Sequence, residues 1–121
     1  MINPILVSVV DDDESVRESL PDLLQELGFR VRSFDSAEAF LASDWIDRTQ
    51  CLILDIALSG MSGPQLLQEL TDSGRRIPTV FITAHGDEAL RERLLAQGAV
   101  ACLLKPFSET ALLAALDAAL P

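Results

Sequence analysis

Near its start the chain carries the apolar stretch ILVSVV at residues 5–10, which the acidic run DDD at residues 11–13 ends abruptly. A continuous run rich in β-branched residues is typical of a strand that is buried on both faces. Two further stretches have the same character, CLIL at 51–54 and PTVFI at 78–82. Strands of this kind belong to a parallel sheet that helices cover on both sides.

Helical periodicity fills the segments between the strands. Apolar residues there recur three or four positions apart, and serine, aspartate or glycine marks the ends. Pro21, inside the first of these segments, predicts a kink or a frayed turn. Two more strands are expected, one at 29–34, where alternation indicates a half-exposed edge, and one at 100–104. The expected helices run from 16 to 27, 37 to 41, 63 to 70, 87 or 88 to 97, and 109 to 120.

Strands that alternate with helices in this way predict an α/β fold. Right-handed crossovers restrict the topology to a small doubly wound sandwich, a flavodoxin-like (βα)5 arrangement around a five-stranded parallel sheet. The 121 residues are enough for one compact domain, and 49% hydrophobic residues are enough for its core. In such folds the functional crevice lies at the carboxyl ends of the strands.

Charge and composition exclude several classes of function. Nineteen acidic residues against nine lysines and arginines give a net charge of −10, which disfavours direct nucleic-acid binding and suits a divalent cation or a basic partner. A single histidine, His85, and two distant cysteines, Cys51 and Cys102, argue against zinc and Ser-His-Asp chemistry. The cysteines are expected as reduced, buried core residues. No signal peptide or membrane span is apparent, so a cytoplasmic location without membrane association is expected.

Polar residues stand at the ends of four expected strands. They are Asp11 and Asp12, Asp55, Thr83, and Lys105. Singly, each has an ordinary explanation as a turn former, helix cap or solvated side chain. Together at one sheet edge they suit phosphoryl transfer to a carboxylate. Crowded carboxylates attract Mg²⁺, and Asp55 is the expected nucleophile. The Lys105 and Thr83 side chains would stabilise the transferring group.

Five motifs contain or adjoin these residues: VVDD at 9–12, LDI at 54–56, MSG at 61–63, ITA at 82–84 and KPF at 105–107. Together they resemble the receiver domain of bacterial two-component response regulators, over essentially all 121 positions. The segments SAEAFL at 36–41 and HGD at 85–87 resemble the FixJ-type branch, whose members usually carry a C-terminal helix-turn-helix DNA-binding domain.

The resemblance implies the strand order 2-1-3-4-5 and a phosphoacceptor, Asp55. A sensor histidine kinase would supply the phosphoryl group from a phosphohistidine. Asp12, Asp55 and the Ala57 carbonyl would bind Mg²⁺ directly, and Asp11 would act through water.

The family's switch mechanism defines the remaining expectations. Thr83 and Lys105 would contact the phosphoryl group, and the surface near the fourth helix and fifth strand would change to control an output, expected to be transcription. A homodimer formed on phosphorylation is the expected readout. The chain would not be an enzyme in the ordinary sense, because it would catalyse only its own phosphorylation and dephosphorylation.

Three features depart from the family pattern. Leu58-Ser59 replaces the usual Met-Pro, which would free the loop that carries the Ala57 carbonyl. Cys102 replaces the usual Phe or Tyr, which predicts a weakened or rerouted conformational switch. The chain ends at Leu120-Pro121, so residues 1–121 are expected to form a receiver domain, either as an excised fragment or as a stand-alone receiver, with no DNA-binding effector domain in this chain.

Two alternatives compete with the phosphoacceptor switch. The first is an aspartyl phosphatase of the haloacid dehalogenase type, for which Asp11 and Asp13 supply an Asp-x-Asp motif, but no acidic pair follows Lys105 and Asp55 is left without a role. The second is a phosphorylation-independent interaction module. The complete set of polar strand ends argues against it, whereas Leu58-Ser59 and Cys102 favour it.

Overall fold

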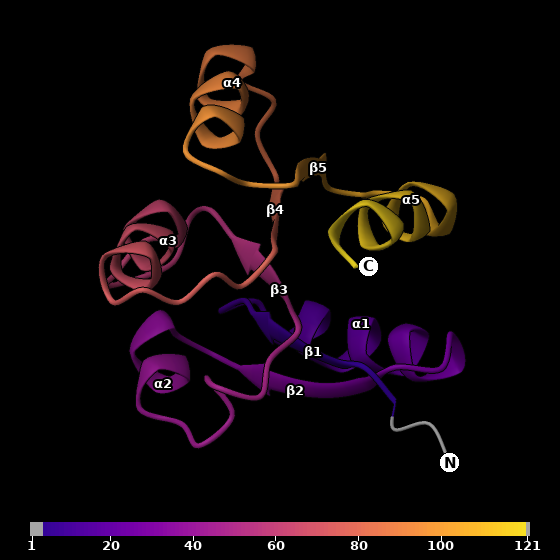
Figure 1. The fold of residues 1–121 in the computed structure, drawn as a ribbon. Helices are drawn as coiled ribbons and strands as arrows, with labels where there is room; N and C mark the ends of the chain where they lie inside the picture. The colour runs from indigo at the N-terminus through magenta and orange to yellow at the C-terminus, as the bar shows by residue number, and fades with distance from the viewer. Residues whose placement is uncertain (1–3, 121) are drawn as a thin grey trace.

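The computed structural model describes residues 4–120 and contains a five-stranded parallel sheet in the order β2-β1-β3-β4-β5 (Figure 1). This is the predicted doubly wound topology. The strands are β1 (Leu6–Val10), β2 (Arg30–Phe34), β3 (Cys51–Asp55), β4 (Thr79–Thr83) and β5 (Ala101–Leu104). The helices are α1 (Glu14–Glu26), α2 (Ala37–Leu41), α3 (Gly63–Asp72), α4 (Glu88–Ala96) and α5 (Glu109–Ala119).

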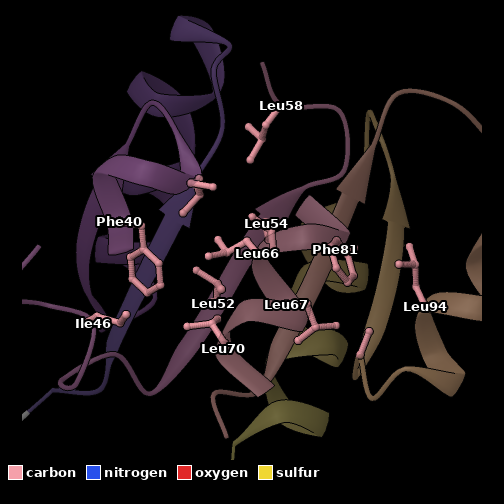
Figure 2. Close-up of a cluster of buried hydrophobic side chains, with 13 residues drawn as sticks. Phe40, Ile46, Leu52, Leu54, Leu58, Leu66, Leu67, Leu70, Phe81 and Leu94 are labelled. Atoms are coloured by element: carbon pink, nitrogen blue, oxygen red, sulfur yellow. The ribbon is translucent and has the colours of Figure 1, made fainter. Parts of the chain in front are cut away.

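Helices cover both faces of the sheet, with α1 and α5 on one side and α2, α3 and α4 on the other (Figure 1). Alternate residues of the central strands serve the two cores, because successive strand side chains point to opposite faces. Leu52 and Leu54 pack with Phe40 and Leu66 under α2 and α3 (Figure 2). Ile53 lies in the second core, under α1 and α5. The three central strands are buried throughout, as their continuous apolar sequences predict.

Side-chain caps define where the helices begin. The predicted capping box at α3 is present: the Ser62 hydroxyl accepts the Gln65 N–H at 3.2 Å, and the Gln65 side chain accepts the Ser62 N–H at 2.9 Å. Asp13 and Asp87 cap α1 and α4 in the same position, and Ser36 and Ser108 cap α2 and α5. Each cap supplies an acceptor for a backbone N–H that the first turn of its helix would otherwise leave unpaired.

Helix α1 runs unbroken through Pro21, so the expectation of a frayed turn there is wrong. A proline within a helix deprives the carbonyl four residues earlier, here that of Arg17, of its hydrogen bond. Leu20 and Leu24 on either side of the proline are buried in the core. Their burial holds the turn together despite the missing hydrogen bond.

The two edges of the sheet differ in burial and in composition. β2 is mostly exposed and carries Arg30 and Arg32, and the Arg32 guanidinium lies 4.0 Å from the centre of the Trp45 ring. β5, at the other edge, is half-buried, and Leu104 keeps 53% of its surface exposed. Cys51 is buried as predicted, but Cys102 is only partly buried because it lies on this edge strand. Within residues 4–120, no helix is both long enough and apolar enough to span a bilayer.

Burial of α1 against the sheet predicts a large difference between two otherwise identical substitutions. Leu24 is fully buried, so Leu24→Ala is expected to lower the free energy of unfolding by about 2–5 kcal/mol. Leu104→Ala removes the same atoms from an exposed site and is expected to cost less than about 1 kcal/mol. Urea unfolding of both variants measures the difference, and equal losses would contradict the described packing of α1.

Candidate functional site

The carboxyl ends of four neighbouring strands bring the predicted site residues to one edge of the sheet. Asp11 and Asp12 follow β1, Asp55 ends β3, Thr83 ends β4 and Lys105 follows β5. Val10 pairs with Leu54, so Asp11 lies level with Asp55 on the adjacent strand. The strand order therefore assembles residues that are as much as 94 positions apart in the sequence.

Three carboxylates form a tight cluster at this edge. Asp11, Asp12 and Asp55 each offer an oxygen within 4.8 Å of the others. Asp11 is fully buried and Asp55 is buried, whereas Asp12 is exposed to solvent. The buried pair supplies fixed negative charge, and the exposed member leaves the cluster open to an incoming ion.

Lys105 neutralises part of this charge. Its Nζ donates a hydrogen bond of 2.8 Å to Asp11 Oδ2 and lies 3.6 Å from Asp55 Oδ2. The second oxygen of Asp11 accepts the N–H of Asp13 at 2.9 Å. Burial alone would lower the pKa of Lys105, but the hydrogen bond to Asp11 and the negative charges of Asp11 and Asp55 raise it above its ordinary value. Lys105 is therefore a permanently charged bridge between the two buried carboxylates.

The electrostatics of Asp55 differ from those of an ordinary aspartate. Burial raises its pKa, and the neighbouring Asp11 carboxylate raises it further, to about 6. Lys105 opposes this increase, as does the Ala57 N–H, which donates to Asp55 Oδ1 at 3.3 Å. At neutral pH the side chain is mostly ionised, and the Lys105 ammonium offsets only part of the effect of burial and of Asp11.

The loop that follows β3 is held in place, although it lacks the proline expected of the family. Asp12 Oδ2 accepts the Ser59 N–H at 3.3 Å and the Ser59 hydroxyl at 3.4 Å. The Leu58 side chain is buried in the core under α2 and α3. Sequence reasoning treated these two residues only as departures, and missed that they attach the loop carrying Ala57 to the acidic cluster and to the core.

The Thr83 hydroxyl is directed toward its own loop. It accepts the His85 N–H at 3.1 Å and donates to the His85 carbonyl at 3.2 Å. Among residues 4–120 it has no hydrogen bond to the carboxylate cluster. Thr83 thus lies at the predicted strand end, but its hydroxyl is not directed at Asp55, and the His85 side chain is exposed.

A cavity of about 380 Å³ opens beside Thr83, between the β4–α4 loop, α4 and β5. Cys102 and Leu104 line it together with Arg91. Partial burial raises the pKa of the Cys102 thiol, so the thiol is neutral at physiological pH. The small side chain at position 102 leaves space next to Thr83 that a larger one would occupy.

A doubly wound parallel sheet with a carboxylate cluster and a lysine at its carboxyl edge is typical of flavodoxin-like α/β proteins with an acidic cluster at the strand ends. Within this class the chain belongs to the response regulator receiver domain family, whose model matches residues 7–117. The sequence-based resemblance is confirmed. Asp13, the second aspartate of the phosphatase-type motif, caps α1 through Ser15 instead of joining the cluster.

Several known proteins are similar to this chain over most of its length. The transcriptional regulatory protein FixJ of Rhizobium meliloti is 41% identical over 113 residues, which cover 93% of this chain and 55% of FixJ. Nodulation protein W of Bradyrhizobium diazoefficiens is 44% identical over 114 residues, which cover 94% of this chain and 50% of that protein. The chain thus spans about half the length of these curated relatives.

Two solved structures support the same relationship. The response regulator StyR superposes with a TM-score of 0.89 at 47% identity, covering 98% of this chain and 60% of that chain. The FixJ-N crystal structure superposes with a TM-score of 0.86 at 38% identity, covering 98% of this chain and 94% of that one. The likeness includes the FixJ-type branch that the sequence predicts.

The raised pKa of Asp55 predicts a pH-dependent stability difference. The pKa of Asp55 is near 4 in the unfolded chain and about 6 in the folded protein. Ionisation of Asp55 therefore lowers the free energy of unfolding progressively as the pH rises from about 4 to about 6. In EDTA, Asp55→Asn is therefore expected to increase the free energy of unfolding by about 1–3 kcal/mol at pH 7.5 and to have little effect at pH 4. Urea unfolding measures both values, with Asp12→Asn, at the exposed member of the cluster, as the control. An equal effect of Asp55→Asn at the two pH values would contradict the described electrostatics.

Proposed function

We propose that this domain is the phosphoacceptor switch of a two-component signalling system, in which Asp55 receives a phosphoryl group from the phosphohistidine of a sensor histidine kinase. The observation that carries the proposal is the buried Asp55 carboxylate, which lies beside Asp11 and Lys105 at the carboxyl edge of the sheet. Membership in the receiver family supports it.

The acidic cluster fits a hard divalent cation, and we assign it to Mg²⁺. Three carboxylates with oxygens within 4.8 Å of one another, partly neutralised by a single lysine, retain net negative charge. Asp12, Asp55 and the Ala57 carbonyl would hold the ion, and Asp11 would act through a bound water. When bound, the ion would neutralise the oxygens of the transferring group.

Asp55 acts as the nucleophile. One of its carboxylate oxygens attacks the phosphorus in line with the phosphorus–nitrogen bond of the phosphohistidine. That bond breaks, its electron pair stays on the imidazole nitrogen, and an acyl phosphate forms on Asp55. The ammonium of Lys105, 3.6 Å from Asp55 Oδ2, stabilises the added negative charge at the phosphoryl oxygens.

Thr83 connects the acyl phosphate to the surface. To donate a hydrogen bond to a phosphoryl oxygen, its hydroxyl must leave the His85 carbonyl, which rearranges the β4–α4 loop. That rearrangement alters the surface near α4 and β5, where a homodimer would form on phosphorylation. Cys102 cannot replace an aromatic side chain in this process, so we infer a weakened or rerouted switch with the acceptor chemistry retained.

The output of the protein that contains this domain is proposed to be transcription, since similar proteins carry the name transcriptional regulatory protein. Residues 1–121 act as the receiver, and the net charge of −10 assigns it no direct contact with nucleic acid. Its own catalysis is limited to gaining and losing the phosphoryl group. A phosphorylation-independent interaction module is less well supported, because it gives the buried carboxylates and Lys105 no role.

Incubation with acetyl phosphate and Mg²⁺ is expected to add one phosphoryl group to the wild-type domain. Asp55→Asn removes the nucleophile and is expected to abolish the adduct, as is EDTA, which removes the cation. Intact mass spectrometry measures the adduct, and Asp47→Asn, an exposed aspartate outside the cluster, is the matched control. A folded wild-type protein that binds Mg²⁺ but forms no adduct would favour the interaction module.

Cys102→Phe is expected to restore a larger conformational response. The cavity of about 380 Å³ beside Thr83 has room for a ring, so phosphorylation is expected to produce larger amide NMR shifts in α4 than in the wild-type protein. Cys51→Ser, at the buried cysteine on β3, is the control and leaves the response unchanged. The weakened-switch hypothesis fails if Cys102→Phe responds to phosphorylation no more strongly than the wild type.

A further inference from the structure

The segment 56–62, which we call the cation loop, is attached to helix α2 by a carboxylate that has no place in the proposed chemistry. Glu38 Oε2 accepts the N–H of Met61 at 3.3 Å, a contact between residues 23 positions apart. Glu38 is solvent-exposed, so burial does not explain its position. The hydrogen bond to Met61 connects Glu38 to the loop that carries Ala57, next to the acidic cluster.

The backbone of the cation loop approaches Glu38 closely at Gly60. A Cβ atom built at Gly60 would lie 2.5 Å from Glu38 Oε2, closer than real contacts of that kind. Gly60 also has a φ of +74°, a conformation that glycine adopts without strain. The tip of the loop therefore lies directly against the carboxylate of Glu38.

Helix α2 holds the backbone of Glu38 in a defined position. The Ser36 hydroxyl accepts the Ala39 N–H at 3.0 Å and caps the helix. Ala37 and Phe40, on the core-facing side of the same helix, are completely buried. A short helix held in this way restricts where the Glu38 carboxylate can lie.

Glu38 is one of several attachments of the cation loop, which include the Ile56 N–H donating to the Ile82 carbonyl and the Ala57 N–H donating to Asp55. Leu58 anchors the loop in the core, and Ser59 hydrogen-bonds to Asp12, which is itself a proposed cation ligand. A bound cation would compete with Ser59 for the Asp12 oxygens. The hydrogen bond from Met61 to Glu38 involves no proposed cation ligand, so it would persist when the ion binds. Ala57, whose carbonyl is the proposed backbone ligand, lies in the same loop.

We propose that Glu38 is a positioning residue that holds the cation loop so that the Ala57 carbonyl is available to Mg²⁺. It acts through the backbone of the loop and does not touch the ion or the phosphoryl group. This inference rests on the proposed function, and it assigns Glu38 an effect on cation affinity. The effect comes from its hydrogen bond and not from its negative charge.

Calorimetric titration with Mg²⁺ tests the proposal on three variants. Glu38→Ala removes the hydrogen bond and is expected to weaken Mg²⁺ binding about 3- to 10-fold, within the range that the net contribution of one ordinary hydrogen bond accounts for. Glu38→Gln keeps an acceptor oxygen without the charge and is expected to restore most of the affinity. Glu69→Ala removes an equal charge from α3, close to Gly60 and Met61, and is expected to leave the affinity unchanged.

A second readout needs no metal. In EDTA, amide hydrogen exchange at Met61 is expected to be faster in Glu38→Ala than in the wild type or in Glu38→Gln, with an unchanged urea midpoint for all variants. Wild-type affinity in Glu38→Ala would overturn the proposal, as would an equal loss in Glu38→Ala and Glu38→Gln, which would indicate a simple charge effect. If the wild type itself bound no Mg²⁺, the proposed cation site would be wrong, and the role of Glu38 with it.

Discussion

The pairing of the buried Asp11 carboxylate with Lys105 is the interaction on which the rest of the site depends. A fully buried carboxylate without a partner is strongly destabilising, and its partner here comes from the far side of β3 and β4. The pair therefore requires β1, β3, β4 and β5 to be assembled in the observed order. Once formed, it places an ammonium beside Asp55 and leaves the exposed Asp12 as the accessible member of the cluster.

Much of the fold was predictable because its signals are local. Continuous apolar runs mark the central strands, and serine and aspartate caps mark the helix starts, as at Ser62 and Ser108. The strand ends were predictable as a site because parallel strands bring their carboxyl ends to one edge. Each of the five polar side chains expected there lies at that edge, on or directly after its strand.

What escaped prediction depends on tertiary contacts that no local pattern encodes. The hydrogen bonds of Thr83 to His85 depend on the path of a loop, and those of Ser59 and Glu38 join segments far apart in the chain. Cys102 is less buried than its apolar sequence suggests, because its strand forms an edge of the sheet. Packing around α1 likewise outweighs the local preference of Pro21 to end a helix.

The two edge strands of the sheet, β2 and β5, differ in charge, so the two edges are not equally suited to pairing with another chain. An open strand edge offers unpaired backbone groups to other chains, and charged side chains oppose such pairing. Like charges on Arg30 and Arg32 would meet if two β2 edges approached each other, so lateral growth of the sheet is blocked there. The opposite edge has no charged side chain on β5 and exposes Leu104, so of the two edges only this one lacks a charge barrier to pairing with another chain.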